Sequence, residues 1–273
     1  MFIIDCHTHF FPENLFRAIW KFFDDYLWGI QHKIFADELI QKLKSIGISK
    51  MVLLNYAHKP DMSQALNQWT REFADQYPEI IPFGTVHPHD EGLDRIMTQC
   101  FEDHGFYGLK LHALVLKMPV DDPVFFPIYE KMEEIGKILM LHAGTGPEFQ
   151  NSAEGNAEFA GVKRVKLILK NYPTLKLVIP HLGAEEMDEF FDLMEEHKNL
   201  WMDTTMMLAG YFSSQPSLER IEKLSDRILY GSDAPNIPYP LDAEMNNIKK
   251  WFSKDIQEKL FFKNAQKLMG LTI

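Results

Sequence analysis

Cysteine and long apolar runs are both scarce in this sequence. Only two of its 273 residues are cysteines, Cys6 and Cys100, too few and too far apart for a disulfide framework. No stretch reaches the roughly 18 apolar residues that a membrane-spanning helix needs. The first residues also lack the basic and small-residue segments of a signal peptide. We therefore expect a globular protein of the reducing cytoplasm that does not associate with membranes.

Positive charge is scarce as well. The chain has 28 lysine and arginine residues against 39 aspartate and glutamate residues, and its net charge is −11. Proteins that bind nucleic acid neutralise phosphates with basic side chains, so nucleic acid is disfavoured as a partner. The apolar content of 46% and the charged content of 25% are those of an ordinary globular protein. We expect a small-molecule substrate and leave open a homo-oligomer such as a dimer.

A glycine-rich phosphate loop is also missing. The segment DCHTHF (5–10) follows the first apolar run, where a GxGxxG motif would open a dinucleotide-binding fold. Short, nearly continuous apolar runs recur along the chain, as is typical of strands covered on both faces of a parallel sheet. The runs are residues 2–5, 50–55, 80–86, 107–111, 137–141, 175–180, 199–203 and 227–231.

Longer amphipathic segments separate these runs. Residues 63–78, 123–136 and 184–197 have helical patterns, and the first and last of them space apolar residues by three and four. About eight strand–helix units, in a length near the ~250 residues that is typical, predict an α/β protein with a (β/α)8 TIM barrel. We expect a single domain over residues 1–273, in which residues 255–271 form a C-terminal helical extension that closes the ring from outside. A doubly wound open sheet gives a similar alternation, but the missing glycine-rich loop argues against it.

Histidines gather at the ends of the predicted strands. Seven of the eleven histidines lie there, namely His7, His9, His87, His89, His112, His142 and His181. Lys110, Asp203 and Asp233 share this placement. Because the active sites of barrel enzymes lie at the carboxyl ends of the strands, we treat these residues as one set.

The first two histidines of the set are separated by a single residue. Residues i and i+2 of a strand point to the same face, about 6.5–7 Å apart along the chain. His7 and His9 can therefore bind one ion, at distances of about 2.0–2.1 Å. Cys6 then points the other way, and we interpret it as a small buried hydrophobe. A His-x-His pair alone is equally compatible with a structural role, but the other strand-end residues favour a metal site.

Five of these strand ends together resemble the amidohydrolase superfamily. The matching motifs are DCHTHF (5–10), LKLH (109–112), LMLHAG (139–144), VIPHLG (178–183) and YGSDAP (230–235). They span essentially the whole chain, and their order and spacing are similar to those of the amidohydrolase-related branch of metal-dependent barrel hydrolases and decarboxylases. The motifs are specific for the family and say little about the substrate.

The resemblance implies one divalent metal ion, most often zinc, bound by His7, His9, His142 and Asp233. Three imidazoles and a carboxylate suit zinc and leave a position for water; manganese is the other candidate. A metal-activated water would attack a carbonyl, with Asp233 carrying its proton to the leaving group. His181 is implied to act on the substrate or the water, by orienting the water or by stabilising the oxyanion.

Each of these residues also has a structural interpretation. His181 can be a core histidine bonded to the backbone, and Asp233 can cap a helix that begins near Pro235. His142 can simply end its strand.

Lys110 and His112 share a strand face, and we expect them to bind substrate. Lys110 can also be a carboxylated lysine that bridges two metal ions, as in binuclear members of the superfamily, or it can pair with a nearby acid. Asp203 can support His181 or form a surface pair. The aromatic segment 10–28 is interpreted as core packing, with a hydrophobic lid over the site as the alternative.

The activity that we predict is hydrolysis of a C–O or C–N bond in a small molecule, such as a lactone or an amide. The alternative is non-oxidative decarboxylation of a small aromatic or unsaturated carboxylic acid, for which the same ligands would serve. The strand-end segments contain almost no arginine, and this scarcity favours hydrolysis because carboxylate-rich substrates call for basic contacts. A barrel without catalysis is disfavoured by the complete ligand set, and a metal nuclease is disfavoured by the acidic charge.

Overall fold

The computed structural model describes residues 1–145, 158–212 and 215–272. These residues form parallel strands in two hydrogen-bonded groups, one of three strands and one of six. The first group contains β1 (Ile4–Thr8), β2 (Lys50–Leu53) and β3 (Ile80–Pro82). The second group contains β4 (Gly84–Thr85), β5 (Gly108–His112), β6 (Ile138–His142), β7 (Lys176–Ile179), β8 (Leu200–Asp203) and β9 (Ile228–Leu229).

Strands β3 and β4 are the two halves of the single strand predicted over residues 80–86, interrupted at Phe83. The amide of Phe83 still donates to the carbonyl of Leu53, at 3.2 Å. With this pair counted as one, the strands occupy the eight positions that the sequence predicts.

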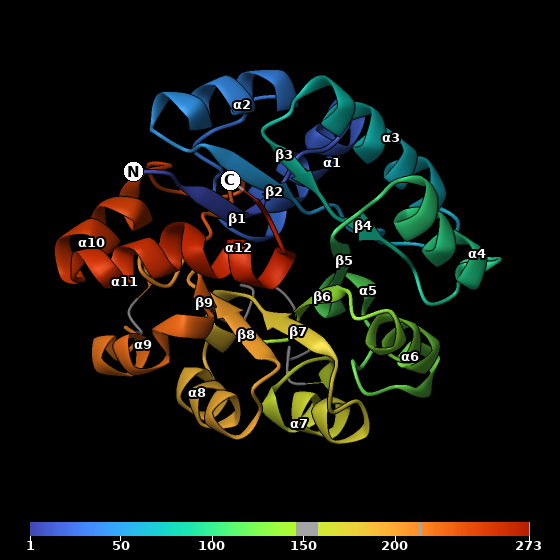
Figure 1. Cartoon of the computed structure of the whole chain (residues 1–273). Coiled ribbons are helices and arrows are strands. Elements are labelled where there is room, and N and C mark those ends of the chain that lie inside the picture. Colours follow the sequence, from blue (N-terminus) through green and yellow to red (C-terminus); the bar gives the residue numbers. More distant parts are fainter. Residues whose placement is uncertain (146–157, 213–214, 273) are drawn as a thin grey trace.

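Helices alternate with the strands and surround them on the outside (Figure 1). Those in the first half of the chain are α1 (Glu13–Tyr26), α2 (Ala36–Ser45), α3 (Ser63–Gln76), α4 (Leu93–Thr98), α5 (Ala113–Leu116) and α6 (Phe126–Glu134). Those in the second half are α7 (Val162–Asn171), α8 (Met187–Glu196), α9 (Leu218–Leu224), α10 (Ala243–Trp251), α11 (Lys254–Glu258) and α12 (Asn264–Met269). None of the helices in the described part of the chain is long and apolar enough to cross a membrane.

The ring of strands closes between β1 and β9. The amide of Cys6 donates to the carbonyl of Tyr230 at 2.8 Å, and the amide of Asp233 donates to the carbonyl of His7 at 2.9 Å. Thr8 and Ala234 form a further parallel bridge at this seam. The strands therefore form a closed (β/α)8 barrel, and the predicted fold class is confirmed.

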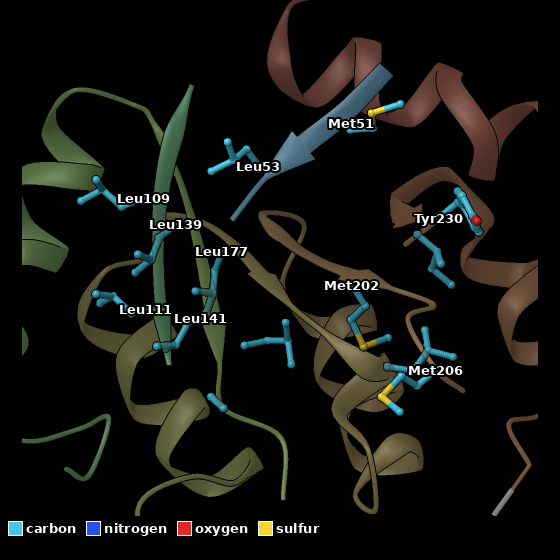
Figure 2. Close-up of a cluster of buried hydrophobic side chains, with 14 of the residues drawn as sticks. Met51, Leu53, Leu109, Leu111, Leu139, Leu141, Leu177, Met202, Met206 and Tyr230 are labelled. Atoms are coloured by element: carbon cyan, nitrogen blue, oxygen red, sulfur yellow. The ribbon is translucent and has the colours of Figure 1, made fainter. Parts of the chain in front are cut away.

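One hydrophobic cluster fills the inside of the ring. Its members come from strands all around the barrel: Ile4, Val52, Ile81, Ile138, Met140, Val178, Trp201 and Leu229. Side chains from opposite sides of a closed ring can meet only in its interior. Alternate strand residues such as Met51, Leu109 and Leu177 face the other way, into a larger cluster with the helices (Figure 2). This alternation is the strand periodicity of two.

The C-terminal helix α12 closes one end of the barrel. Its residues Ala265, Leu268 and Met269 belong to the interior cluster, together with Phe2 and Tyr107, which precede β1 and β5. This end is therefore the amino-terminal end of the strands, opposite the histidines, and Figure 1 shows α12 lying across it. The helical extension is present as predicted, but its last helix covers an end of the ring and does not pack only on its outside.

Strand β1 contains an irregularity that decides which side chains face inward. Its pairing with β2 runs Ile4 to Lys50 and Asp5 to Met51, and the register then shifts before Thr8 meets Leu53. An extra residue at such a bulge breaks the alternation. Ile4 and Cys6, two residues apart, both lie in the interior cluster as the alternation requires, and Cys6 is fully buried. The alternation breaks after Cys6, because His7 is directed towards the open end of the barrel. The expected burial of Cys6 is observed, but it lies inside the ring, whereas the prediction placed it on the other face of the strand.

Candidate metal centre

The polar residues of the site extend the inward faces of the strands. Met140 and Trp201 belong to the interior cluster, and two residues later β6 and β8 end in His142 and Asp203. A spacing of two keeps these side chains on the inward face. The carboxyl ends of the strands thus carry the predicted site residues above an apolar interior.

Three buried residues come together as possible ligands of one metal ion. One nitrogen each of His7 and His9 and one oxygen of Asp233 lie within 4.8 Å of one another. Asp233 Oδ1 is 2.9 Å from His9 Nε2 and 3.5 Å from His7 Nε2. His7 lies in β1, His9 directly follows it and the aspartate follows β9, so the group spans the seam at which the barrel closes.

The outer nitrogens of the histidines are already occupied by protein groups. His9 Nδ1 lies 2.6 Å from the carbonyl of Leu54, and His7 Nδ1 lies 2.8 Å from Asp203 Oδ2. A carbonyl only accepts, so His9 donates from Nδ1, and its Nε2 is the nitrogen that faces Asp233. Metal-binding histidines in proteins are held by outer partners of this kind. The donor set and its orientation therefore fit a divalent metal ion.

Burial and charge favour the protonation states that metal binding requires. Burial lowers the pKa of His7 well below its usual value, and the nearby Lys110 charge lowers it further. Burial alone would raise the pKa of Asp233, but the neighbouring imidazoles of His9, His7 and His181 lower it to about 2. The imidazole is therefore neutral and the carboxylate ionised, as metal ligands must be.

His142 lies near this group of three without being part of it. Its ring centroid is 4.7 Å from that of His181 and 3.9 Å from that of His112, to which it is nearly parallel at 9°. Burial lowers the pKa values of His112 and His142 well below the usual value. The structure places His142 at the end of β6 as the sequence predicts, and its role as fourth ligand stays a prediction.

His181 faces the same space from the loop after β7. Its ring centroid lies 5.3 Å from that of His7, and its Nδ1 lies 3.1 Å from the carbonyl of Thr205. The proton is therefore on Nδ1, and Nε2 is free to accept a proton or a hydrogen bond. The backbone bond that the structural interpretation required is present, but it orients His181 towards the site.

Among the lysines in the described part of the chain, Lys110 alone is fully buried. Its Nζ lies 3.5 Å from His7 Nε2, and burial lowers its pKa to about 8. His112, two residues later on the same face, is half-buried and stacks on His142. Both predicted substrate-binding residues thus line the space beside the possible ligands.

Two buried residues beside the ligands carry roles that the sequence left open or did not reveal. Asp203 was a candidate support for His181, and it accepts the backbone amide of His181 at 2.9 Å while also contacting His7 Nδ1. Tyr56 was not predicted at all. Its ring lies 5.5 Å from that of His9 and 5.2 Å from that of His112. Its position directly after the second predicted strand was the available signal.

The backbone of the site is strained at several positions. Five non-glycine residues of the loops after β7, β8 and β9 have positive φ angles: His181 (57°), Leu182 (51°), Ala184 (55°), Met206 (67°) and Asp233 (65°). Such angles are uncommon outside glycine, persist only where the surroundings hold them, and cluster at functional sites.

The aromatic segment 10–28 packs partly into the core, and its role as a lid stays a prediction. Phe16 is fully buried, whereas Phe22 on the same helix is 52% exposed. Trp28 Nε1 donates to the carbonyl of Asn236, at 2.8 Å. The segment therefore packs into the core at one end and joins the loop after β9 at the other.

We predict that Asp203→Asn lowers metal affinity by about 10- to 100-fold, the usual effect of losing an outer partner of a histidine ligand. The asparagine amide can accept a hydrogen bond from His7 Nδ1, but it lacks the negative charge of the aspartate. Competition with a chromophoric chelator measures the affinity. Asp90→Asn is a matched control, because Asp90 is a buried carboxylate that accepts the amides of His87 and Asp61 away from the ligands. Equal affinities of the Asp203 variant and the wild type would contradict the prediction.

Sequence comparison relates the chain to known proteins. The sequence model of the amidohydrolase family matches residues 4–271. The chain is 25% identical, over 196 residues, to 2-keto-4-carboxy-3-hexenedioate hydratase of Sphingobium sp. (strain NBRC 103272 / SYK-6). That match covers 63% of this chain and 58% of the hydratase.

Solved structures share the fold at lower identity. The crystal structure of 2,6-dihydroxybenzoate decarboxylase from Rhizobium superimposes with a TM-score of 0.74 and 19% identity, covering 99% of each chain. That of 5-carboxyvanillate decarboxylase from Novosphingobium aromaticivorans DSM 12444, complexed with manganese, gives a TM-score of 0.72 and 17% identity, covering 99% of this chain and 96% of the other. At these identities the likeness shows a shared barrel fold.

Proposed function

The chain belongs to the amidohydrolase family, and from this premise we propose that it is a metal-dependent hydrolase of a small molecule. The bond that it would cleave is a C–O or C–N bond next to a carbonyl, as in a lactone or an amide. The observation that carries the proposal is the buried group formed by His7, His9 and Asp233, in which the histidine Nε2 atoms and a carboxylate oxygen face one another.

The residues proposed to hold the ion are His7, His9 and Asp233, with His142 from β6 as the fourth ligand. Zinc is the proposed metal because imidazole nitrogens dominate the donor set, and manganese is the alternative that such a mixed N/O set also accepts. A divalent ion held there would lower the pKa of a water molecule and polarise a substrate carbonyl.

The side chains around the ligands supply the proton transfers. Asp233 Oδ1 is in the middle of the group, where it would take a proton from the attacking water and pass it to the leaving group. His181 presents an unprotonated Nε2, which favours orienting the water over donating a hydrogen bond to an oxyanion. Lys110 and His112 would hold the substrate, with Lys110 as a buried cation for a polar or anionic group.

A lyase is the second candidate function, and the named relatives favour it. One is a hydratase and the solved structures include two decarboxylases. Hydration would use the same activated water as hydrolysis, whereas non-oxidative decarboxylation of an aromatic or unsaturated acid would need a group that protonates carbon. The near absence of arginine at the strand ends favours the hydrolase, because relatives that act on carboxylated substrates need countercharges.

A parallel assay of three reactions tests the proposal. The protein is purified without chelator, its metals are quantified, and samples stripped of metal are reloaded with zinc or manganese. Lactones and amides are screened for acid or amine release, and aromatic and unsaturated acids for CO₂ release and loss of conjugated absorbance. We expect metal-dependent hydrolysis. CO₂ release or water addition without hydrolysis would favour the lyase, and a protein that binds no metal after reconstitution would refute both.

A further inference from the structure

Asp5 is a buried acid of β1 to which the chemistry proposed above gives no role. Its side chain has no exposed surface. Its Oδ1 accepts two hydrogen bonds, from the backbone amide of His7 at 3.2 Å and from that of Ser232 at 3.0 Å. The first amide belongs to a proposed ligand, and the second belongs to the residue directly before the proposed ligand Asp233. One carboxyl oxygen therefore links the two backbone segments that carry these ligands.

The His7 amide needs this acceptor because strand pairing is interrupted beside it. The register of β1 with β2 passes from the pair Asp5–Met51 directly to the pair Thr8–Leu53. A bulge of this kind takes a residue out of the ladder, and a buried amide outside the ladder needs another acceptor. Asp5 supplies that acceptor from two residues earlier in the chain. A side chain thus holds His7 at an irregular point of its strand.

On the other side of the seam, Asp233 lies in a strained turn. Its φ angle of 65° is uncommon outside glycine and persists only where the surroundings hold it. The Ser232 amide before it donates to Asp5 Oδ1, and the Ala234 amide after it donates to Ser232 Oγ at 3.0 Å. Ser232 is itself 1% exposed. The side chains of Asp5 and Ser232, called the seam clamp below, therefore fix the backbone on both sides of Asp233.

Closing the barrel does not by itself call for an acid at this place. The backbone bonds from Cys6 to Tyr230 and from Asp233 to His7 already join the two strands. Asp5 Oδ2 has no hydrogen-bond partner within the described residues, and an unpaired polar atom is costly to bury. A carboxyl kept at such a cost, with both accepted amides at or beside ligands, indicates a role in the geometry of the site.

We propose that the seam clamp positions the metal ligands. Asp5 holds the His7 backbone and the turn of Asp233 together across the seam, and Ser232 Oγ keeps Asp233 in its left-handed conformation. The two ligands then cannot move independently, which keeps His7 Nε2 and Asp233 Oδ1 3.5 Å apart. This inference rests on the proposed metal site. Asp5 and Ser232 are positioning residues, because they act on the ligands through backbone amides.

Zinc titration of the metal-free protein, with a chromophoric chelator as competitor, tests this role. We expect Asp5→Ala to lower zinc affinity by about 10- to 100-fold, as for other outer supports of ligands. Asp5→Asn should stay within about threefold of wild type, because the amide oxygen still accepts both bonds. Its Nδ2 takes the place of Oδ2, so no bond is displaced. The two variants together distinguish the held backbone from the charge of the carboxylate.

The absorption spectrum of the cobalt-substituted protein is the second readout, because it reports ligand geometry. It should change in Asp5→Ala and match the wild type in Asp5→Asn. A purely structural role would lower the melting temperature of Asp5→Ala without changing this spectrum.

Asp90→Ala is the matched control. Asp90 is also a buried carboxylate that accepts two backbone amides, those of His87 and Asp61, each at 2.7 Å and away from the ligands. Its loss should lower the melting temperature and leave zinc affinity unchanged. If Asp5→Ala does not fold, Ser232→Ala removes the other acceptor of the seam clamp with little change in size and should lower zinc affinity in the same direction.

The outcomes separate the two proposals. Wild-type zinc affinity in Asp5→Ala, or in Ser232→Ala where the Asp5 variant is unfolded, would overturn the positioning role while leaving the metal site intact. Equal losses in Asp5→Ala and Asp5→Asn would overturn it because charge would then explain the effect. An equal loss in Asp90→Ala would overturn it because general destabilisation would suffice. A wild-type protein that binds no zinc would instead refute the proposed function.

Discussion

An Asp233→Ala variant is expected to purify without its metal ion and without activity. Asp233 is the carboxylate of the buried group, and its Oδ1 lies between the Nε2 atoms of His7 and His9. Its removal leaves neutral imidazoles to hold a dication without a countercharge. Even outer partners of ligands are worth about 10- to 100-fold in affinity, so the loss should exceed about 100-fold. Elemental analysis and chelator competition measure it.

The same measurement separates two stacked histidines. His142→Ala should also lose the metal, whereas His112→Ala should retain it, although the two rings lie face to face at 3.9 Å. His112→Ala is therefore the control for a general disturbance of this corner. Melting temperatures of the metal-free variants show that each remains folded. Full metal content in both Asp233→Ala and His142→Ala would refute the ligand assignment.

Gly231→Ala is expected to destabilise the fold and to disturb the site at the same time. A Cβ atom at this position would lie 2.2 Å from Thr205 Oγ1 and 2.7 Å from the Cβ of His7. Neither neighbour can turn away cheaply, because one is a β-branched side chain and the other is the first atom of a ligand. Overpacking of this kind costs about 1–3 kcal/mol, and a shift of His7 would weaken metal binding as well. Urea unfolding gives the change in the free energy of unfolding.

A second substitution identifies the cause of this effect. In the double variant Gly231→Ala, Thr205→Ala, the hydroxyl that collides is absent, so part of the lost stability should return as a coupling energy between neighbours. The Thr205 carbonyl that holds His181 is unaffected. Gly29→Ala is the control, because nothing lies within 4 Å of its added Cβ, and a change within about 0.5 kcal/mol is expected. Equal stabilities of the single and double variants would contradict the steric explanation.

The sequence predicted those parts of the site that depend on strand order and strand ends. In a parallel barrel all carboxyl ends meet at one end, so a histidine or aspartate directly after an apolar run has a defined place. For this reason the positions of His7, His9, His181 and Asp233 along the chain were enough to assign them to one centre. Fold class followed from the same alternation of apolar runs and amphipathic segments.

Other features depend on contacts that no local pattern encodes. The irregularity in β1 lets His7 face the site although Cys6, directly before it, lies in the interior cluster. The stacking of His112 on His142 depends on the register of β5 with β6, which pairs these residues directly. Register and helix docking are set by packing over the whole barrel, so they appear only in three dimensions.

The position of the candidate metal centre on the seam between β1 and β9 has a consequence for biosynthesis. The chain emerges from the ribosome with His7 and His9 first, and Asp5 precedes its seam partner Ser232 by 227 residues. A nascent chain thus lacks the proposed ligand Asp233 until β9 has been made. Binding of the ion would then join the two ends of a very long loop. In theory, a metal ion that closes a long loop gives the folded state its largest stabilisation.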